Sequence, residues 1–409
     1  MRRTYGYAAV TKDAAQRSIW TFYETVPEVA VSLFLTVFFM LYAGMHGYAF
    51  MKAGAAFAFG AAANIALALF MLVMLFMPFI IHNLEKYGLD TIARPAALAG
   101  YTWMGVLFLF CSAAAPIDCY RFAIDALGFF SKRNYAHMSV SDYHLFMTAL
   151  IISLLIAAYG YFQARDIRTE RIVITTPKIS SELSMIRIVQ ISDVHLGLIV
   201  REERLSRILA VVKKAAPDML VSTGDLVDGQ ISKRNGLAAM LREITPRYGK
   251  YAVTGNHEFY AGIEQSLNFS QEAGFTMLRG SASSGPITVA GVDDPTAKAF
   301  GLSQAISEKT LLQTLTGNAF ILLLKHRPLV DKSSDGLFDL QMSGHVHKGQ
   351  IFPFSILTKI YYPVYAGYKK LPGRAHLYVS RGSGTWGPPI RFLAPPEVTI
   401  IELVHGEVL

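Results

Sequence analysis

A chain of 409 residues with 52% hydrophobic and only 17% charged residues does not have the composition of an ordinary soluble protein, in which roughly a quarter of the residues are charged. Its net charge of +8 could point to nucleic acid, but there is no DNA- or RNA-binding motif and no long run of lysine and arginine, so no such partner is expected. The two cysteines, Cys111 and Cys119, lie in or beside an apolar segment, which argues against a disulfide framework.

The apolar excess lies before Gln163, and residues 1–167 are predicted to form a membrane domain. Four uncharged apolar runs approach or exceed the roughly 20 residues that a helix needs to cross a bilayer. We therefore expect about four transmembrane helices, near residues 29–50, 56–81, 96–117 and 145–162. Roughly 28 mixed polar residues precede the first run, so a cleavable signal peptide is not expected.

Two features of this region have alternative interpretations. His46 lies inside the first run and could be a proton or metal site, although a structural role near an interface is commoner. Asp118–Phe130 is too short and too charged to span a bilayer, which favours an amphipathic helix at the interface.

The distribution of positive charge predicts the topology. With four spans, one side of the membrane carries Arg2, Arg3, Lys12, Arg17, Lys86, Arg94, Arg165, Arg168 and Arg171, and the other carries Lys52, Arg121, Lys132 and Arg133. Because the more positive side is normally cytoplasmic, the second half of the chain is predicted to lie in the cytoplasm. A fifth crossing would reverse this assignment.

Residues 168–409 have the pattern of an α/β domain, with short β-branched runs alternating with helical stretches. The predicted strands are Ile186–Ile191, Met219–Ser222, Tyr251–Val253, Ile287–Ala290, Ala319–Leu324, Phe338–Met342 and Leu377–Ser380. The predicted helices are Leu205–Lys214 and Asn235–Leu241.

Five groups of polar side chains each follow one of these strands. They are Asp193 with His195, then Asp225, then Asn256 with His257, then His326, and last His345 with His347. Open α/β sheets build their sites past the C-terminal ends of strands, so we expect the groups to converge. Carboxylate, amide and imidazole ligands without a thiolate suit Mn, Fe or Zn.

The series of motifs, Asp-x-His, Gly-Asp, Gly-Asn-His, His and Gly-His-x-His, resembles that of the calcineurin-like metallophosphoesterases over about Arg171–Leu409. The run at 256–260 and the tail at 381–389 resemble the membrane-associated branch typified by bacterial YkuE-like proteins. The resemblance implies a four-layer α/β sandwich, two mixed sheets flanked by helices, after the α-helical transmembrane bundle. It also implies a multi-pass protein of the bacterial inner membrane.

The resemblance implies two divalent metal ions. Asp193, His195 and His347 would hold the first ion, and Asn256, His326 and His345 the second, with Asp225 bridging them. His257 would protonate the leaving oxygen or stabilise its charge instead of binding metal. Glu258 and Asp228 have no assigned role, although we expect Glu258 to hold a neighbouring loop by hydrogen bonds.

The predicted activity is hydrolysis of a phosphodiester, phosphomonoester or pyrophosphate bond by a hydroxide shared between the two ions. A tethered domain is most useful when its substrate is also held at the membrane, so a lipid-linked substrate is favoured. One alternative is a soluble phosphodiester such as a cyclic nucleotide. Another is a non-catalytic receptor or transporter with a regulatory metal domain, although no ligand of the motif series is missing. The oligomeric state is not predicted.

Two further expectations concern the substrate. Lys348 stands where many relatives have glycine and could reach a substrate anion, although a solvated lysine is the alternative; Asn256 is a second candidate contact. The run Ile351–Tyr368 is rich in Phe, Tyr and Ile and follows the last ligand group directly. It is expected either to lie toward lipid or the helix bundle, or to pack on the domain's own core.

Overall fold

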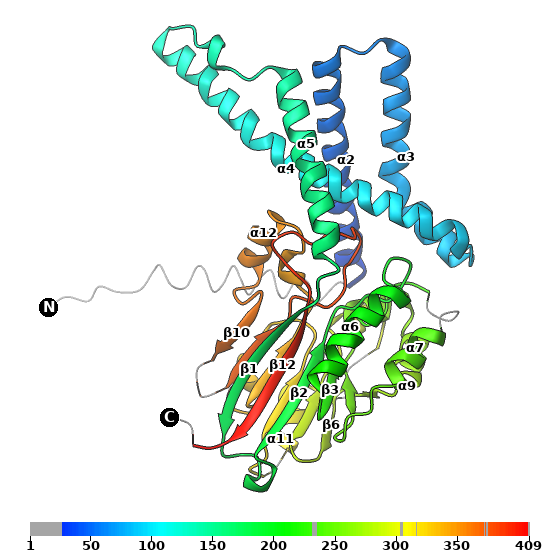
Figure 1. Ribbon diagram of the computed structural model, residues 1–409, viewed down its shortest axis with the longest axis vertical. Helices are drawn as coiled ribbons and strands as arrows, with labels where there is room; N and C mark the ends of the chain where they lie inside the picture. Colours follow the sequence, from blue (N-terminus) through cyan, green and yellow to red (C-terminus); the bar gives the residue numbers. More distant parts are fainter. Residues whose placement is uncertain are drawn as a thin grey trace, which may run out of the picture.

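The computed structural model describes residues 27–230, 235–302, 306–315, 317–371, 373 and 375–407. A bundle of long helices stands on one end of a two-sheet α/β domain (Figure 1). Four of the positive charges used to predict the topology lie outside the described residues, namely Arg2, Arg3, Lys12 and Arg17.

Four long helices form the bundle and contain the predicted apolar runs, except that the helix of the second run begins at Ala61 and not at residue 56. They are α2 (Pro27–Phe57), α3 (Ala61–Lys86), α4 (Asp90–Ser131) and α5 (Asp142–Gln163). In the part of the chain that the structure describes, three segments are long and apolar enough to cross a membrane, namely Ala61–Lys86, Asp90–Ser131 and Ala136–Gln163. A total of about four spans stays a prediction.

Helix α4 differs from the expectation for this region. It runs for 42 residues, so Asp118–Phe130 continues it instead of forming a separate helix. At about 1.5 Å per residue the helix is roughly 63 Å long, twice the thickness of the hydrocarbon core, and it runs obliquely across the bundle (Figure 1). Two of its charged residues form ion pairs: Asp118 binds Lys52 at 2.7 Å, and Arg121 binds Asp142 at 2.6 Å.

His46 links two helices of the bundle. Its Nδ1 lies 2.8 Å from the carbonyl oxygen of Tyr42, one turn earlier in α2, and its Nε2 accepts the indole N–H of Trp103 in α4 at 3.0 Å. Because both ring nitrogens are hydrogen-bonded and the side chain is buried, the contacts favour the structural alternative for this residue.

The α/β domain consists of two six-stranded mixed sheets that pack face to face. The first has the order β1 (Arg168–Thr176), β12 (Glu397–His405), β2 (Met185–Ile191), β3 (Met219–Ser222), β4 (Lys250–Ala252) and β5 (Thr276–Met277). The second has the order β10 (Gly367–Lys370), β11 (His376–Val379), β9 (Leu340–Ser343), β8 (Ile321–Leu324), β7 (Thr288–Gly291) and β6 (Ser281–Ser284). One buried cluster, which includes Ile188, Val221, Leu322 and Met342, joins their inner faces.

Helices cover the outer faces of both sheets. The core of the first sheet includes side chains of α6 (Glu202–Ala215), α7 (Asn235–Arg242) and α9 (Ile263–Glu272), and that of the second includes α11 (Glu308–Thr314). The prediction of two mixed sheets flanked by helices is therefore confirmed for this part of the chain.

The seven predicted strands are present, with ends displaced by at most two residues. The prediction missed β1 and β12, which pair in parallel along nine residues. Charged residues interrupt their apolar patterns, and the fold pairs these charges across elements: Glu402 in β12 binds Arg187 at 3.1 Å. The short strands β5, β6 and β10 were also missed. β5 has only two residues, and β6 and β10 consist of small or polar residues and lack the β-branched run that marked the predicted strands.

The α/β domain docks closely onto α4 and α5. Ile351 and Ile390 pack against Leu109 and Ala157 of these helices. The backbone N–H of Arg391 donates to the carbonyl oxygen of Gly160 at 3.0 Å. A Cβ atom at Gly160 would lie 2.5 Å from Ile390 Cγ2, closer than real contacts allow.

We expect Gly160→Ala to loosen this junction. Alanine normally favours a helix over glycine by about 1 kcal/mol, but overpacking at a close contact costs about 1–3 kcal/mol, so the net effect should be destabilising. The measurement is the thermal unfolding midpoint of the full chain in detergent. Gly44→Ala in α2 is the matched control, because a Cβ there meets no atom within 4 Å. Equal midpoints for the two variants would contradict the docking argument.

Candidate metal centre

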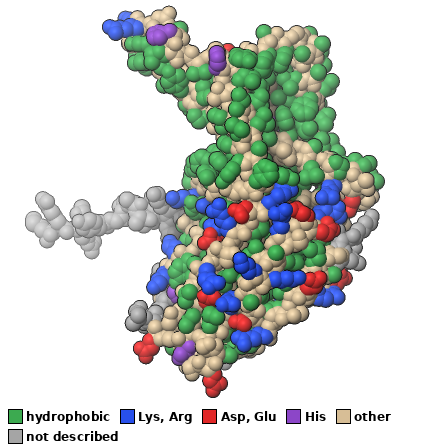
Figure 2. Space-filling model, viewed as in Figure 1, with side chains coloured by type: hydrophobic (Ala, Val, Ile, Leu, Met, Phe, Trp, Pro, Cys, Tyr) green, Lys and Arg blue, Asp and Glu red, His purple; other side chains and the backbone are tan. Residues whose placement is uncertain are grey.

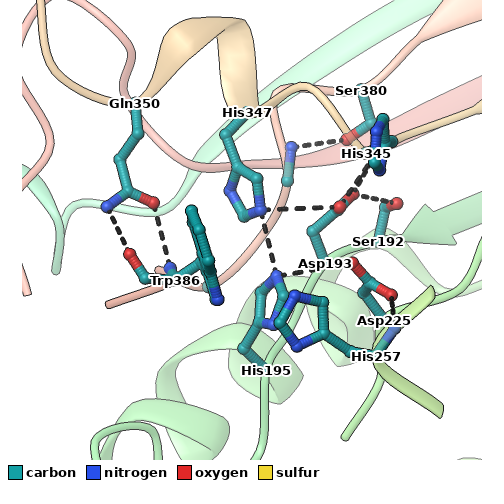
Figure 3. A network of polar contacts seen from close by, with 12 residues as sticks. Ser192, Asp193, His195, Asp225, His257, His345, His347, Gln350, Ser380 and Trp386 are labelled. Atoms are coloured by element: carbon teal, nitrogen blue, oxygen red, sulfur yellow. Dashed lines mark hydrogen bonds and ion pairs between the residues drawn. The ribbon is translucent and has the colours of Figure 1, made fainter. Parts of the chain in front are cut away.

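The five predicted groups of polar side chains converge where the strands of both sheets end. Figure 1 shows that these strand ends face the bundle, and Figure 3 shows Asp193, His195, Asp225, His257, His345 and His347 together. Asp193 and His195 follow β2, and Asp225 follows β3. Asn256 and His257 begin α8 (Asn256–Ala261) after β4. His326 follows β8, and His345 and His347 follow β9.

Asp193, His195 and His347 form a first cluster of buried ligand atoms. The Nε2 atoms of the two imidazoles are 3.0 Å apart, and His347 Nε2 lies 3.5 Å from Asp193 Oδ1. Burial lowers the pKa of His195 to about 4 and that of His347 well below its usual value. Both rings are therefore neutral near pH 7, which is the form that binds metal.

Asp225, His326 and His345 form a second cluster. His326 Nε2 lies 3.2 Å from Asp225 Oδ2, 3.1 Å from His345 Nδ1 and 3.3 Å from Asn256 Oδ1. The other nitrogen of His326, Nδ1, lies 2.8 Å from the carbonyl oxygen of Thr223. A hydrogen bond of this kind fixes the orientation of a ligand imidazole and leaves Nε2 to face the cluster.

Asp225 belongs to the second cluster and also faces the first. Its Oδ2 is 3.2 Å from His326 Nε2 in the second cluster and 3.8 Å from His195 Nε2 in the first. A single carboxylate therefore faces ligand atoms of both, as a bridging ligand must.

The donor atoms fit divalent cations. Each cluster offers three nitrogen or oxygen atoms within 4.8 Å of one another, and none of these ligands is a thiolate. The backbone conformation is a second indication of a functional site. Five of the candidate ligands have a left-handed conformation with φ between 47° and 73°, namely Asp193, His195, Asp225, His345 and His347. This conformation is costly for residues other than glycine, and such strain gathers at functional sites.

The Asp193 carboxylate also connects the two sheets. It accepts the backbone N–H of His345 at 2.8 Å and the hydroxyl of Ser192. The loop after β2 in the first sheet is thereby held against the loop after β9 in the second (Figure 3). The relative position of the candidate ligands thus depends on the packing of the two sheets.

His257 lies at the edge of the clusters, where its ring is held by a carboxylate. Its backbone N–H donates to Asp225 Oδ1 at 2.9 Å, and its Nδ1 lies 2.9 Å from Asp228 Oδ1. Burial lowers the pKa of His257, but the carboxylates of Asp225 and Asp228 raise it more, to about 9. A ring with Nδ1–H bound to Asp228 presents Nε2 as the site of a transferable proton.

Sequence reasoning left Asp228 without a role, although its spacing of three residues after Asp225 is a signal that could have been used.

The expectation for Glu258 is confirmed. Its carboxylate accepts the N–H groups of Gly255, Asp225, Leu226 and Val227 at 2.6–3.3 Å. Glu258 therefore fixes the loop that carries Asp225.

The segment at 381–391 covers one side of the site. The Trp386 ring lies 5.8 Å from the His257 ring, and Gln350 holds the Trp386 backbone by hydrogen bonds at both its N–H and its carbonyl (Figure 3). The fully buried guanidinium of Arg391 donates to the carbonyls of Gly384, Arg381 and His347. The sequence marked this segment only by its resemblance to a family, so its contact with the site was missed.

Lys348 is half-buried and follows the candidate ligand His347 directly, with φ of 52°. Burial lowers the pKa of Lys348, and the charge of Arg381 lowers it further, while Glu397 and Glu170 raise it. Its contact with substrate stays a prediction, as does that of Asn256, whose amide oxygen lies in the second cluster.

The comparison with known proteins agrees with this geometry. A family model described as calcineurin-like phosphoesterase matches residues 186–349. A metallophosphoesterase of Aquifex aeolicus is 38% identical over 258 residues, which cover 62% of this chain and 98% of that protein. The chain belongs to the calcineurin-like metallophosphoesterases. It is therefore a metal-dependent phosphoesterase.

Two further metallophosphoesterases bear on the branch of the family. YkuE of Bacillus subtilis is 34% identical over 62% of this chain and 93% of its own length. A transmembrane protein with metallophosphoesterase domain from Danio rerio is 32% identical over 62% of this chain and 62% of its own length. Together with the three apolar helices, the second relative supports association of this metallophosphoesterase with a membrane.

Proposed function

We propose that the protein is a membrane-embedded phosphoesterase that uses two divalent cations to hydrolyse a phosphodiester, phosphomonoester or pyrophosphate bond of a lipid-linked substrate. The observation that carries the dinuclear part is the position of Asp225, 3.2 Å from His326 and 3.8 Å from His195. Its carboxylate can serve two ions that the flanking histidines hold.

In this proposal Asp193, His195 and His347 would hold the first ion, Asn256, His326 and His345 would hold the second, and Asp225 would be shared. When bound, the cations supply positive charge for the phosphoryl oxygens and lower the pKa of the attacking water.

His257 stands outside both ligand sets and donates a proton from Nε2 to the leaving oxygen. Asp228 keeps the ring in place through Nδ1, at 2.9 Å. The carboxylate also stabilises the cationic form of the ring, so the proton is available near neutral pH.

The placement of the site supports a lipid-linked substrate. The loops that carry the candidate ligands end beneath the bundle (Figure 1). Glu85 at the end of α3 accepts the backbone N–H of Gln230, only two residues after Asp228. Lys86, Arg94 and Arg165 lie at this end of the helices, so the positive charges favour a cytoplasmic site at the inner membrane of a bacterium.

The test compares each candidate headgroup as a long-chain lipid in vesicles and as a short-chain, water-soluble homologue, with Mn, Fe or Zn supplied. The full-length protein is expected to show kcat/KM at least about tenfold higher for the long-chain form, because remote binding energy contributes to the transition state. Equal values for the two forms, or preference for a cyclic nucleotide, would reject the lipid-linked substrate. Absence of phosphate ester hydrolysis with every metal would reject the enzyme in favour of a regulatory metal domain.

A further inference from the structure

An apolar surface that the catalytic scheme does not use lies on α12 (Phe354–Tyr361), directly after the last ligand group. The exposed fractions of its side chains are large for hydrophobic residues: Phe354 51%, Ile356 53%, Leu357 60%, Ile360 76% and Tyr361 49%. The segment forms a helix, and these side chains do not pack on the domain's own core. A contiguous surface of this kind on a folded domain marks a contact with a partner or a membrane.

The position of α12 relative to the bundle indicates which contact this is. Ile351, three residues before α12, packs with Ala157 of α5 and Leu109 of α4. Ala157 lies six residues before the end of α5 at Gln163, so at about 1.5 Å per residue it is about 9 Å inside the helix end. The Phe354 ring also lies 6.4 Å from the Phe108 ring of α4. The start of α12 is therefore level with the apolar part of the spans.

Residues at the end of α5 mark the polar boundary of the membrane. The Arg165 guanidinium lies 3.6 Å from the centre of the Tyr161 ring, while Phe162 beside it is 69% exposed. Tyrosine and arginine gather where a span meets the headgroups. In Figure 2 the hydrophobic surface of the bundle continues onto the neighbouring end of the α/β domain, and lysine and arginine side chains appear below it.

Exposed basic residues lie on α12 and on β10, the next strand of the chain. Lys359 is exposed on the helix, and Lys369 and Lys370 are exposed on β10, which lies below α12 in Figure 1. An amphipathic helix with aromatic and aliphatic residues on one side and lysines beside them is suited to the boundary between acyl chains and anionic headgroups.

We propose that α12 is an in-plane membrane anchor, with Ile356, Leu357 and Ile360 inserted into the acyl-chain boundary of the bilayer that the bundle spans. Lipid is the favoured occupant because α12 continues the apolar surface of the spans at their own depth. A second copy of the chain or another protein would have to displace lipid at the same level.

Both ends of α12 are connected to the metal centre, so the anchor sets where the site operates. His347 is joined to the helix by the short segment 348–353, and the Tyr362 ring after the helix lies 5.8 Å from the His345 ring. The anchor thus holds the candidate ligands at the headgroup layer. Only this last step rests on the proposed lipid-linked substrate; the depth of α12 does not.

The experiment measures depth in the full-length protein, reconstituted in vesicles of phosphatidylethanolamine and phosphatidylglycerol. A nitroxide label is placed at Ile360→Cys in a Cys111→Ser, Cys119→Ser background, and its collisions with oxygen and with an aqueous nickel chelate are compared. Leu155→Cys on α5, whose side chain is 66% exposed, is the lipid-facing control, and exposed Ser181→Cys on the α/β domain is the aqueous control.

The label at position 360 is expected to collide more often with oxygen than with the nickel chelate, as is expected of the label at position 155. Preferential collision with the nickel chelate, as expected of the label at position 181, would overturn the proposal. Shielding from both reagents would also overturn it, because a protein would then cover the helix. The measurement needs no substrate, so its result does not depend on whether the proposed function is correct.

A second measurement tests the functional consequence. The variant Leu357→Ser, Ile360→Ser should lose about tenfold in rate on a vesicle-held ester and keep its rate on a water-soluble ester in detergent. Equal loss on both substrates would show a general structural defect and would overturn the role of α12 as an anchor that positions the site.

Discussion

Asp225→Asn is expected to reduce turnover of any phosphate ester by about 10³-fold or more and to lower the amount of bound metal. The carboxylate lies between the two clusters, so the loss of its charge weakens the sites of both ions at once. Metal ions stabilise transition-state charge by several kcal/mol, and each 1.36 kcal/mol is a factor of ten in rate. The measurements are kcat for a water-soluble ester and the metal content of the purified protein.

Asp335→Asn is the matched control, since it removes an exposed carboxylate outside the clusters. It should leave both quantities unchanged. If Asp225→Asn bound two ions per chain as firmly as the unaltered protein, the shared role of Asp225 would be refuted, even if activity fell.

His257→Ala is expected to lower kcat by about 10²–10⁴-fold, the usual contribution of a positioned general acid, with metal content unchanged. The prediction separates two possible roles. His257 also lies within reach of His195 and Asp225, so these three residues could in principle hold an ion together. The contact between its Nδ1 and Asp228 favours the acid, because it positions the ring without using Nε2.

The leaving group provides the control for this prediction. A nitrophenolate departs with little help from a proton, so His257→Ala should lose less activity on a nitrophenyl ester than on an alkyl ester. A decrease in bound metal together with equal losses on both esters would show that His257 is a ligand and would refute the acid role.

The bundle and the catalytic domain share an interface that includes parts of the site. The carbonyl oxygen of Gly160 accepts the backbone N–H of Arg391, and the guanidinium of Arg391 donates to the carbonyl oxygen of His347. On the other side, Glu85 holds the loop that follows Asp228. The helices therefore do more than tether the domain, since their ends support loops that carry candidate ligands and the residue that orients His257.

The sequence by itself determined the chemistry and the local structure. The Asp, Asn and His residues after successive strands were recognisable because strand periodicity and turn residues are local, and the apolar runs were recognisable because a span requires about 20 uncharged residues. The strand Met219–Ser222 was predicted with its observed ends. The role of Glu258 followed from its place beside a ligand group.

Only the tertiary structure decided which residues meet. His195 and His347 are 152 positions apart, yet their nitrogens lie 3.0 Å from each other, because the facing sheets bring the loops after β2 and β9 together. The same packing places Asp225 between the clusters, Trp386 beside His257 and α12 level with the spans. These relations depend on strand order and on contacts between distant segments, which a periodic pattern along the chain does not encode.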